Sequence, residues 1–243
     1  MRISLFVPCF VDACYPQVAM AAVEVLERLG HTVEFPEAQT CCGQPPFNTG
    51  MWNEARVVAR RHMRVFEDAE AIVALSGSCG AMMKVFYPEL FSGDADEPLA
   101  REISSKTREF SDFLVNVLQV TDVGASFPGR ATYHDGCHSL RELRLKRPPR
   151  TLLENVRGLE LVEMEEAETC CGFGGMFSVK FPMISSAMGE VKCDSIEATG
   201  AEFVISSDSS CLMQIEGIFR RGGRPRRCLH LAEVLASRES LPA

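Results

Sequence analysis

Two pairs of adjacent cysteines, each followed by a glycine, are the most chemically reactive feature of this sequence. They lie in "QTCCGQPP" (39–46) and in "ETCCGFGG" (168–175). The four thiols belong to Cys41, Cys42, Cys170 and Cys171. Free thiols bind metals and are readily oxidised, so clustered cysteines indicate a metal-binding or redox site. The two stretches therefore predict metal binding or redox chemistry.

Two further cysteines recur with each pair at nearly the same spacing. Cys9 precedes the first pair and Cys79 follows it, as Cys137 precedes the second pair and Cys211 follows it. The offset from each cysteine of the first set to its counterpart in the second is nearly constant along the chain. A recurring spacing of this kind indicates a duplicated structural unit.

Hydrophobic patterning predicts the same order of elements in both units. In the first unit, strands are expected at 3–8, 31–36 and 71–75, and helices at 16–30 and 51–66. In the second unit, strands are expected at 131–134, 159–164 and 202–206, and helices at 150–158 and 181–199. Each unit then ends with a short element and a helix, at 108–118 and 227–237.

A segment rich in turn residues, 121–129, is expected to link the units. The first cysteine-rich domain is therefore expected to span 1–125 and the second 126–243. Alternating strands and helices predict an α/β fold, with a parallel sheet and right-handed crossovers in each domain.

The predicted topology places the cysteines together. The binding crevice of an open parallel sheet lies beyond the carboxyl ends of its strands, and the cysteines of each unit follow strands. We therefore predict two four-thiol sites. Their members are Cys9, Cys41, Cys42 and Cys79 in the first unit, and Cys137, Cys170, Cys171 and Cys211 in the second.

Four thiolates suit either structural zinc or an iron–sulfur cluster. Zinc ligands usually come from C-x2-C or wider spacings, whereas directly adjacent cysteines diverge and more easily reach different irons of one cluster. Cys79 and Cys211 are expected near helix N-termini, where the helix dipole favours the thiolate. The pattern favours iron–sulfur clusters, and it leaves zinc in one unit and free redox-active thiols as open alternatives.

The composition excludes several classes of protein. The 243 residues are 46% hydrophobic, enough for one large domain or two small ones with proper cores. Eleven cysteines would leave one unpaired in a closed disulfide framework. The first ten residues, interrupted by Pro8, are too short for a signal-peptide core or a membrane span. We therefore expect a cytoplasmic protein without a transmembrane segment, whose clustered cysteines bind metal or react.

The formal net charge of −8 argues against nucleic acid as a partner, because phosphate binding depends on an excess of lysine and arginine. No acid–base pair, nucleophile triad or flavin motif stands out either. The chain therefore offers candidate redox centres but no evident site for accepting hydride from a substrate.

The order of Cys9, "CCG" and Cys79, repeated in the second unit, resembles the cysteine-rich CCG-domain family of iron–sulfur proteins. That family includes the catalytic subunit of heterodisulfide reductase and the iron–sulfur subunit of glycolate oxidase. The strongest likeness is to the lactate utilisation protein A group. It is carried by "YHDGCHSLREL" (133–143), "CCGFGGMFSVKFPMISSAM" (170–188), "SCLMQIEG" (210–217) and "LHLAEVL" (229–235), and it covers essentially the whole chain.

The resemblance implies an electron-transferring iron–sulfur subunit of a system that oxidises L-lactate to pyruvate. It also implies LutB-like and LutC-like partner subunits and an electron donor or acceptor protein. Each unit would hold one cluster, expected to be [4Fe-4S]. The family pattern ends each repeat in C-x2-C, but here Met82 and Gln214 stand where the second cysteine would be.

Two other functions stay open at this point. One is a zinc-stabilised interaction module, and the other is thiol–disulfide reduction of the heterodisulfide-reductase type. His134 and His138 flank Cys137 and are candidates for an extra ligand or a proton donor, although a role in capping the backbone fits them equally well. Cys14, Cys193 and Cys228 have no counterparts in the other unit, and a small buried apolar role is expected for all three.

Overall fold

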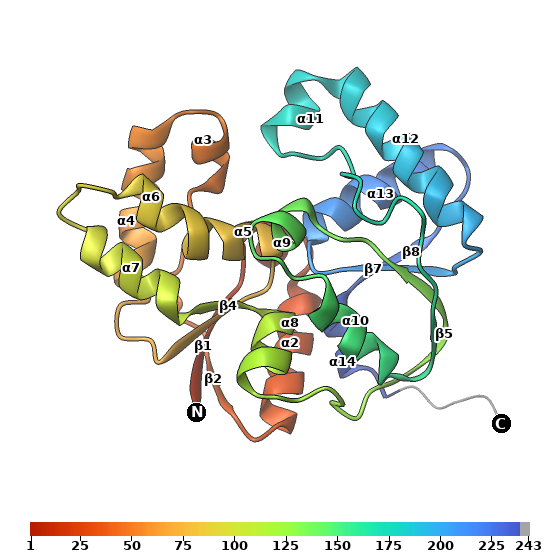
Figure 1. The fold of residues 1–243 in the computed structure, drawn as a ribbon, viewed down its shortest axis with the longest axis horizontal. Helices are drawn as coiled ribbons and strands as arrows, with labels where there is room; N and C mark the ends of the chain where they lie inside the picture. The colour runs from red at the N-terminus through yellow and green to blue at the C-terminus, as the bar shows by residue number, and fades with distance from the viewer. Residues whose placement is uncertain (239–243) are drawn as a thin grey trace.

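The computed structural model describes residues 1–238 (Figure 1). The first half contains β1 (Arg2–Phe6), α1 (Cys9–Cys14), α2 (Pro16–Arg28), β2 (Thr32–Glu34), α3 (Gln44–Asn48), α4 (Trp52–Val65), β3 (Ala71–Ala74), α5 (Gly77–Ala81), the π-helical turn η1 (Met82–Phe86), α6 (Tyr87–Leu90), α7 (Glu97–Lys106), β4 (Thr107–Glu109), α8 (Phe110–Asp112) and a second π-helical turn, η2 (Phe113–Val117).

The second half repeats this order with fewer helices. It contains β5 (Ser126–Tyr133), α9 (Cys137–Arg141), α10 (Arg147–Glu154), β6 (Arg157–Leu161), α11 (Met176–Lys180), α12 (Pro182–Ala198), β7 (Phe203–Ser206), α13 (Ser209–Arg221), β8 (Arg227–His230) and α14 (Leu231–Ala236). Among the described residues, no helix is both long and apolar enough to cross a membrane.

Each half builds a four-stranded sheet, and the two sheets have the same strand order. The orders are β2-β1-β3-β4 and β6-β5-β7-β8, and every pairing is parallel. The central strands β3 and β7 are short, apolar and almost wholly buried, as expected for strands covered on both faces. The predicted α/β fold with a parallel sheet in each half is confirmed.

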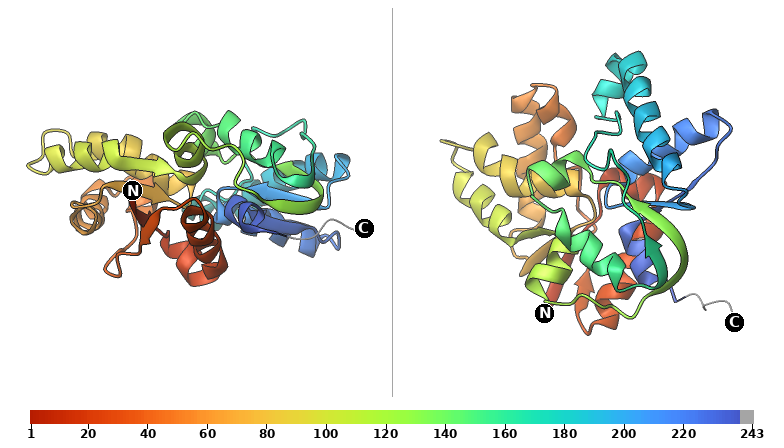
Figure 2. Two further views of the ribbon diagram at one scale, coloured as in Figure 1. Left: turned by 90° about the horizontal axis from the view of Figure 1, so that it is seen from below. Right: turned by 45° about the vertical axis from the view of Figure 1, so that its right-hand side comes forward.

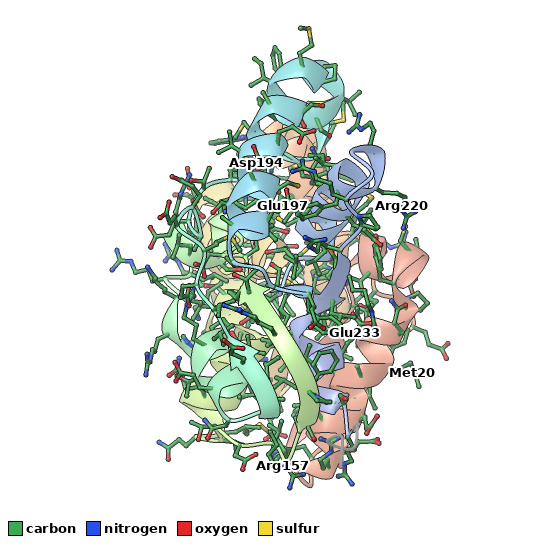
Figure 3. The ribbon with its side chains drawn as sticks, turned by 90° about the vertical axis from the view of Figure 1, so that its right-hand side faces the viewer. Met20, Arg157, Asp194, Glu197, Arg220 and Glu233 are labelled. Atoms are coloured by element: carbon green, nitrogen blue, oxygen red, sulfur yellow. The ribbon has the colours of Figure 1, made fainter. Side chains whose placement is uncertain are left out.

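One of the hydrophobic clusters is a core that the two halves share. Its buried residues come from both halves, including Leu5 and Leu26 of the first and Phe203 and Leu231 of the second. Helix α2 packs against α14, as the left view of Figure 2 and Figure 3 show: Met20 marks α2 and Glu233 marks α14. Because this packing crosses the proposed boundary, the division at 125 and 126 stays a proposal about repeats rather than about separable units.

Arg28, at the end of α2, fastens this contact. Its guanidinium donates to the backbone carbonyls of Val123 and Leu235 at 3.2 Å and to that of Ala236 at 2.7 Å. The carbonyls at the end of α14 have no partners within their own helix, so the guanidinium satisfies groups that burial would otherwise leave unpaired.

One sequence prediction needs correction. The link expected over 121–129 is a strand from Ser126, because β5 begins there and pairs with β6 through an irregular register at Ser126 and Gly129. The short elements that end each half are the fourth strands, β4 and β8. Trp52, at the start of α4, is 41% exposed and stacks on Phe47 with the ring centroids 5.4 Å apart.

Candidate metal centre

The four cysteines of the first half lie at the carboxyl edge of its sheet. Cys9 begins α1 just beyond β1, Cys79 lies in the first turn of α5 beyond β3, and Cys41 and Cys42 lie in the loop between β2 and α3. Neighbouring thiols shift one another's pKa in series, from Cys9 through Cys41 and Cys42 to Cys79. Three separate segments thus deliver four sulfurs to one place, and their role as ligands stays a prediction.

The second half repeats this arrangement. Cys137 begins α9 beyond β5, Cys211 lies in the first turn of α13 beyond β7, and Cys170 and Cys171 lie in the loop before α11. Neighbouring thiols again shift one another's pKa in series, from Cys137 through Cys170 and Cys171 to Cys211. The duplication seen in the sequence is therefore a duplication of sulfur clusters in space.

The glycine after each pair holds a backbone conformation that other residues rarely adopt. Gly43 has φ +88° and Gly172 has φ +85°. A Cβ would lie 3.1 Å from the carbonyl oxygen of Ala55 at the first and 2.4 Å from that of Ser185 at the second. Each glycine N–H also donates to the sulfur of the first cysteine of its pair, at 3.4 Å and 3.3 Å.

Within each pair the two thiols differ in acidity. Hydrogen bonds from Cys42 and Cys9 and from the N–H of Gly43 lower the pKa of the Cys41 thiol to about 2. The same contacts, with burial, raise the pKa of Cys9 and of Cys42. Cys170 repeats the behaviour of Cys41, because the neighbouring thiols lower its pKa to about 2. In each half the first cysteine of the pair is therefore a thiolate, the form that ligates metals.

Both sets of cysteines line one cavity of about 580 Å³. Its walls come from both halves: α3 contributes on one side and α11 on the other, and Figure 1 and the right view of Figure 2 show these helices at the same end of the molecule. Phe10 and Phe173, one from each half, contact each other across it with ring centroids 6.3 Å apart. The two four-thiol sites predicted from the sequence thus open onto a common space.

A buried carboxylate, that of Asp208, lies between the two cysteine sets. One of its oxygens accepts from the Ser76 hydroxyl at 2.5 Å and from the Ser78 N–H at 3.2 Å, and the other accepts from the Ser139 hydroxyl at 3.5 Å. The sequence alone assigned Asp208 no role, since "SDSSC" is typical of a turn before a helix. The donors that surround it come from α5 and α9, which only the folded chain brings together.

His134 lies against the second set of sulfurs. Within residues 1–238, one group of three potential metal ligands has all its ligand atoms within 4.8 Å of one another, and it consists of His134, Cys171 and Cys211. The side chain of His134 is fully buried, and neither of its ring nitrogens has a hydrogen-bond partner. Burial, reinforced by the charge of Lys192, lowers the pKa of His134 to about 3, so the ring is neutral.

The other singled-out residues lie apart from this group. His138 lines the cavity, but its Nδ1 lies 3.3 Å from the Glu142 carboxylate on the next turn. Cys193 is fully buried and Cys228 is half-buried, which suits an apolar role. The expectation that Cys14 is buried is wrong: it ends the short helix α1 and is exposed.

Comparison with known proteins agrees with the duplicated geometry. The family model described as a cysteine-rich domain, CCG, matches residues 3–84 and again 131–216. The chain belongs to the CCG cysteine-rich domain family. The two CCG matches each contain one complete set of four cysteines.

Relatives of this CCG protein match it along its full length. It is 52% identical to a lactate utilization protein A of Geobacillus thermodenitrificans and 51% identical to that of Geobacillus kaustophilus, in both cases over 98% of this chain and 100% of the relative. Among solved structures, an aspartate racemase homologue from Pyrococcus horikoshii covers 97% of this chain and 95% of its own, with a TM-score of 0.34 and 14% identity.

The donor set of this CCG protein fits a thiolate-bound metal group. Four ligands around a single zinc ion would lie within roughly 4 Å of one another. Among the described residues, no three potential ligands of the first half come within 4.8 Å of each other. The sulfurs of the first half are therefore spread more widely than one ion requires, which suits a group with several metal atoms.

Proposed function

We propose that the protein is an iron–sulfur electron-transfer subunit of a system that oxidises L-lactate to pyruvate. The observation that carries this proposal is the pair of four-thiol sets lining one cavity. Full-length likeness to proteins named lactate utilization protein A supports the link to lactate. A binding module without redox chemistry would leave eight clustered thiols without a purpose.

Each half would hold one cluster, of the [4Fe-4S] type, which supplies one-electron transfer when bound. The ligands would be Cys9, Cys41, Cys42 and Cys79 in the first half, and Cys137, Cys170, Cys171 and Cys211 in the second. Residues 1–125 and 126–243 are the two repeats of this proposal.

Groups of the protein itself make these sites favourable for an anionic cluster. The N–H groups of Gly43 and Gly172 point at the first sulfur of each pair and stabilise negative charge there. Cys211 lies in the first turn of the 13-residue helix α13, where the helix dipole stabilises the negative charge of a bound cluster. Phenylalanine rings on the cavity wall, among them Phe177 and Phe181, limit the access of water.

The proposed setting is cytoplasmic, beside LutB-like and LutC-like subunits that would carry the substrate step and pass electrons onward. Among the described residues, no acid, base and hydride acceptor come together around the cavity, whose polar lining is thiols, the hydroxyls of serines and Thr49, His138, Lys180, Asp208 and side-chain amides. This division of labour is part of the proposal.

Anaerobic reconstitution with iron and sulfide tests the proposal. We expect close to eight irons and eight sulfides per chain, and an electron paramagnetic resonance signal on reduction. Cys42→Ser should halve the iron and sulfide, whereas Cys14→Ser, an exposed cysteine outside the cavity, should leave both unchanged. Protein that holds no sulfide after reconstitution would contradict the proposal.

A second candidate, a zinc site in the second half, is favoured by one observation: His134, Cys171 and Cys211 lie close enough to share a single ion. Zinc would stabilise this half as an interaction module without redox chemistry. Metal analysis of protein purified anaerobically separates the two candidates, because zinc without acid-labile sulfide is the signature of the second.

A further inference from the structure

The two halves differ at one position that faces the sulfurs. Phe6 ends β1 three residues before Cys9, and His134 follows β5 three residues before Cys137. Phe6 pairs with Ala74 of β3, and His134 donates its backbone N–H to the carbonyl of Ile205 on β7. The two side chains therefore hold equivalent places, an apolar ring in the first half and an imidazole in the second.

The helices that pack behind the two sets of cysteines, α4 and α12, also differ at one equivalent position. The Cβ positions of Gly43 and Gly172 face the carbonyls of Ala55 on α4 and Ser185 on α12, so these two carbonyls hold equivalent places in the repeat.

The same offset carried along α4 and α12 makes His62 the counterpart of Lys192. The first half thus has Phe6 beside His62, with ring centroids 4.6 Å apart, where the second half has His134 beside Lys192.

Lys192 has every hydrogen-bond donor of its ammonium group matched. It is fully buried, and its Nζ contacts the Met164 sulfur at 3.7 Å, the Ala167 carbonyl at 3.2 Å and the Glu166 carbonyl. An ammonium group has three N–H donors, so these three acceptors satisfy it without His134. The ammonium group of Lys192 therefore does not need the imidazole of His134 as an acceptor.

An imidazole with two unpartnered nitrogens is costly in a buried place, because burying a polar group without a partner is unfavourable. A metal would remove that cost, since the neutral ring offers a lone pair and its ligand atom lies within 4.8 Å of both the Cys171 and the Cys211 sulfur. His62 is also buried, but its Nδ1 contacts the Thr40 carbonyl at 3.2 Å, and it belongs to no such group of potential ligands among the described residues.

We propose that His134 supplies a nitrogen ligand to the metal group of the second half, whereas the first half, with Phe6 at that position, binds through thiolates alone. The identity of the metal group in this inference rests on the proposed function. The position of His134 beside the sulfurs does not depend on that function. Two sites that look alike in their cysteines would then be chemically distinct.

Pulsed electron paramagnetic resonance of the full-length, reconstituted and reduced protein tests this inference. Histidine labelled with ¹⁵N should change a strong nitrogen coupling in the wild-type spectrum, which identifies a histidine ligand without any substitution. The variant His134→Phe, which copies the first half, should lose the coupling. His138→Ala, which removes the histidine that lines the cavity, should keep it.

Iron and sulfide content keeps the two proposals distinguishable. Normal iron and sulfide without histidine coupling, or with coupling that survives in His134→Phe, overturns the inference and leaves the proposed function standing. If no sulfide is bound, the proposed function falls, and Co²⁺ titration of the metal-free protein decides the inference. Cobalt absorption bands that differ between wild type and His134→Phe support a nitrogen ligand, whereas identical bands, or no binding of cobalt, overturn it.

Discussion

The hydroxyl of Ser76 donates a 2.5 Å hydrogen bond to the carboxylate of Asp208, across the contact between the two halves. Both side chains are buried, and the two residues are equivalent in the repeat because the same interval separates Cys79 from Cys211. Ser76 caps α5 and Asp208 precedes α13. The bond therefore links the two helix starts that carry the last cysteine of each set.

Replacing Asp208 should weaken the contact between the two halves. Asp208→Ala leaves the buried Ser76 hydroxyl and the Ser78 N–H without their shared acceptor. Hydrogen bonds to a charged group contribute about 1.5–3 kcal/mol, so we expect a loss of that order in the free energy of unfolding. Urea denaturation measures it. Asp122→Ala, which removes an exposed carboxylate, serves as the control and should change stability by less than about 0.5 kcal/mol.

Glu109 should make stability depend on pH. Burial raises its pKa to about 7 although Ser111 and Asp112 donate to it. At Glu109 the folded state then binds more protons than the unfolded state between pH 4.5 and pH 7, so the contribution of Glu109 to stability is greatest below pH 4.5 and is lost as the pH rises through about 7. The shift corresponds to roughly 3 kcal/mol.

Unfolding free energies across this pH range test the role of Glu109. Glu109→Gln should remove most of the fall, while Glu54→Gln, at an exposed site on α4, should reproduce the wild-type profile. A Glu109→Gln protein that keeps the full pH dependence would assign the effect to other groups.

The glycines of the CCG loops should differ in their tolerance of a methyl group. Gly172→Ala combines a positive φ with a Cβ only 2.4 Å from a backbone oxygen, so the loop must move, and we expect a loss of more than about 2 kcal/mol together with loss of metal from the second half. Gly43→Ala, at 3.1 Å, should cost less. Gly217→Ala lies in α13 with open space around it and should be neutral or stabilise the helix by up to about 1 kcal/mol. Thermal unfolding and iron content per chain measure these effects.

The sequence predicted the local parts of this architecture well. The parallel sheets and the positions of Cys79 and Cys211 in first helical turns follow from hydrophobic runs and turn residues near each cysteine. The repeat spacing also contains the signal for His134, because Phe6 holds the same place three residues before the first cysteine. Comparison of the two repeats position by position would have found it.

The remainder depends on contacts that no local pattern encodes. Arg28 and Leu235 are 207 residues apart, and their contact closes the shared core. The common cavity arises only because this core fixes one half against the other, and Asp208 acquires its partners in the same way. The prediction of a buried Cys14 is wrong because α1 ends at that residue, so its side chain reaches solvent instead of continuing a buried helical face.

Lys192 should set the potential of the second centre. Its ammonium is buried within reach of the thiol pair: the charges of Cys171 and Cys170 act to raise its pKa, although burial lowers the pKa overall. A fixed positive charge favours the reduced state of a nearby metal group. The counterpart His62 is neutral, because burial lowers its pKa to about 4, so the first centre has no such charge.

Replacing Lys192 with methionine should therefore lower the midpoint potential of the second centre by on the order of 50 mV and leave the first unchanged. A redox titration followed by electron paramagnetic resonance measures both centres in one sample. Lys180→Met is the matched control, because Lys180 also lines the cavity but is exposed, and solvent screens its charge. Equal shifts in the two variants would mean that general charge around the cavity, rather than the buried ammonium behind the second CCG loop, determines the difference between the centres.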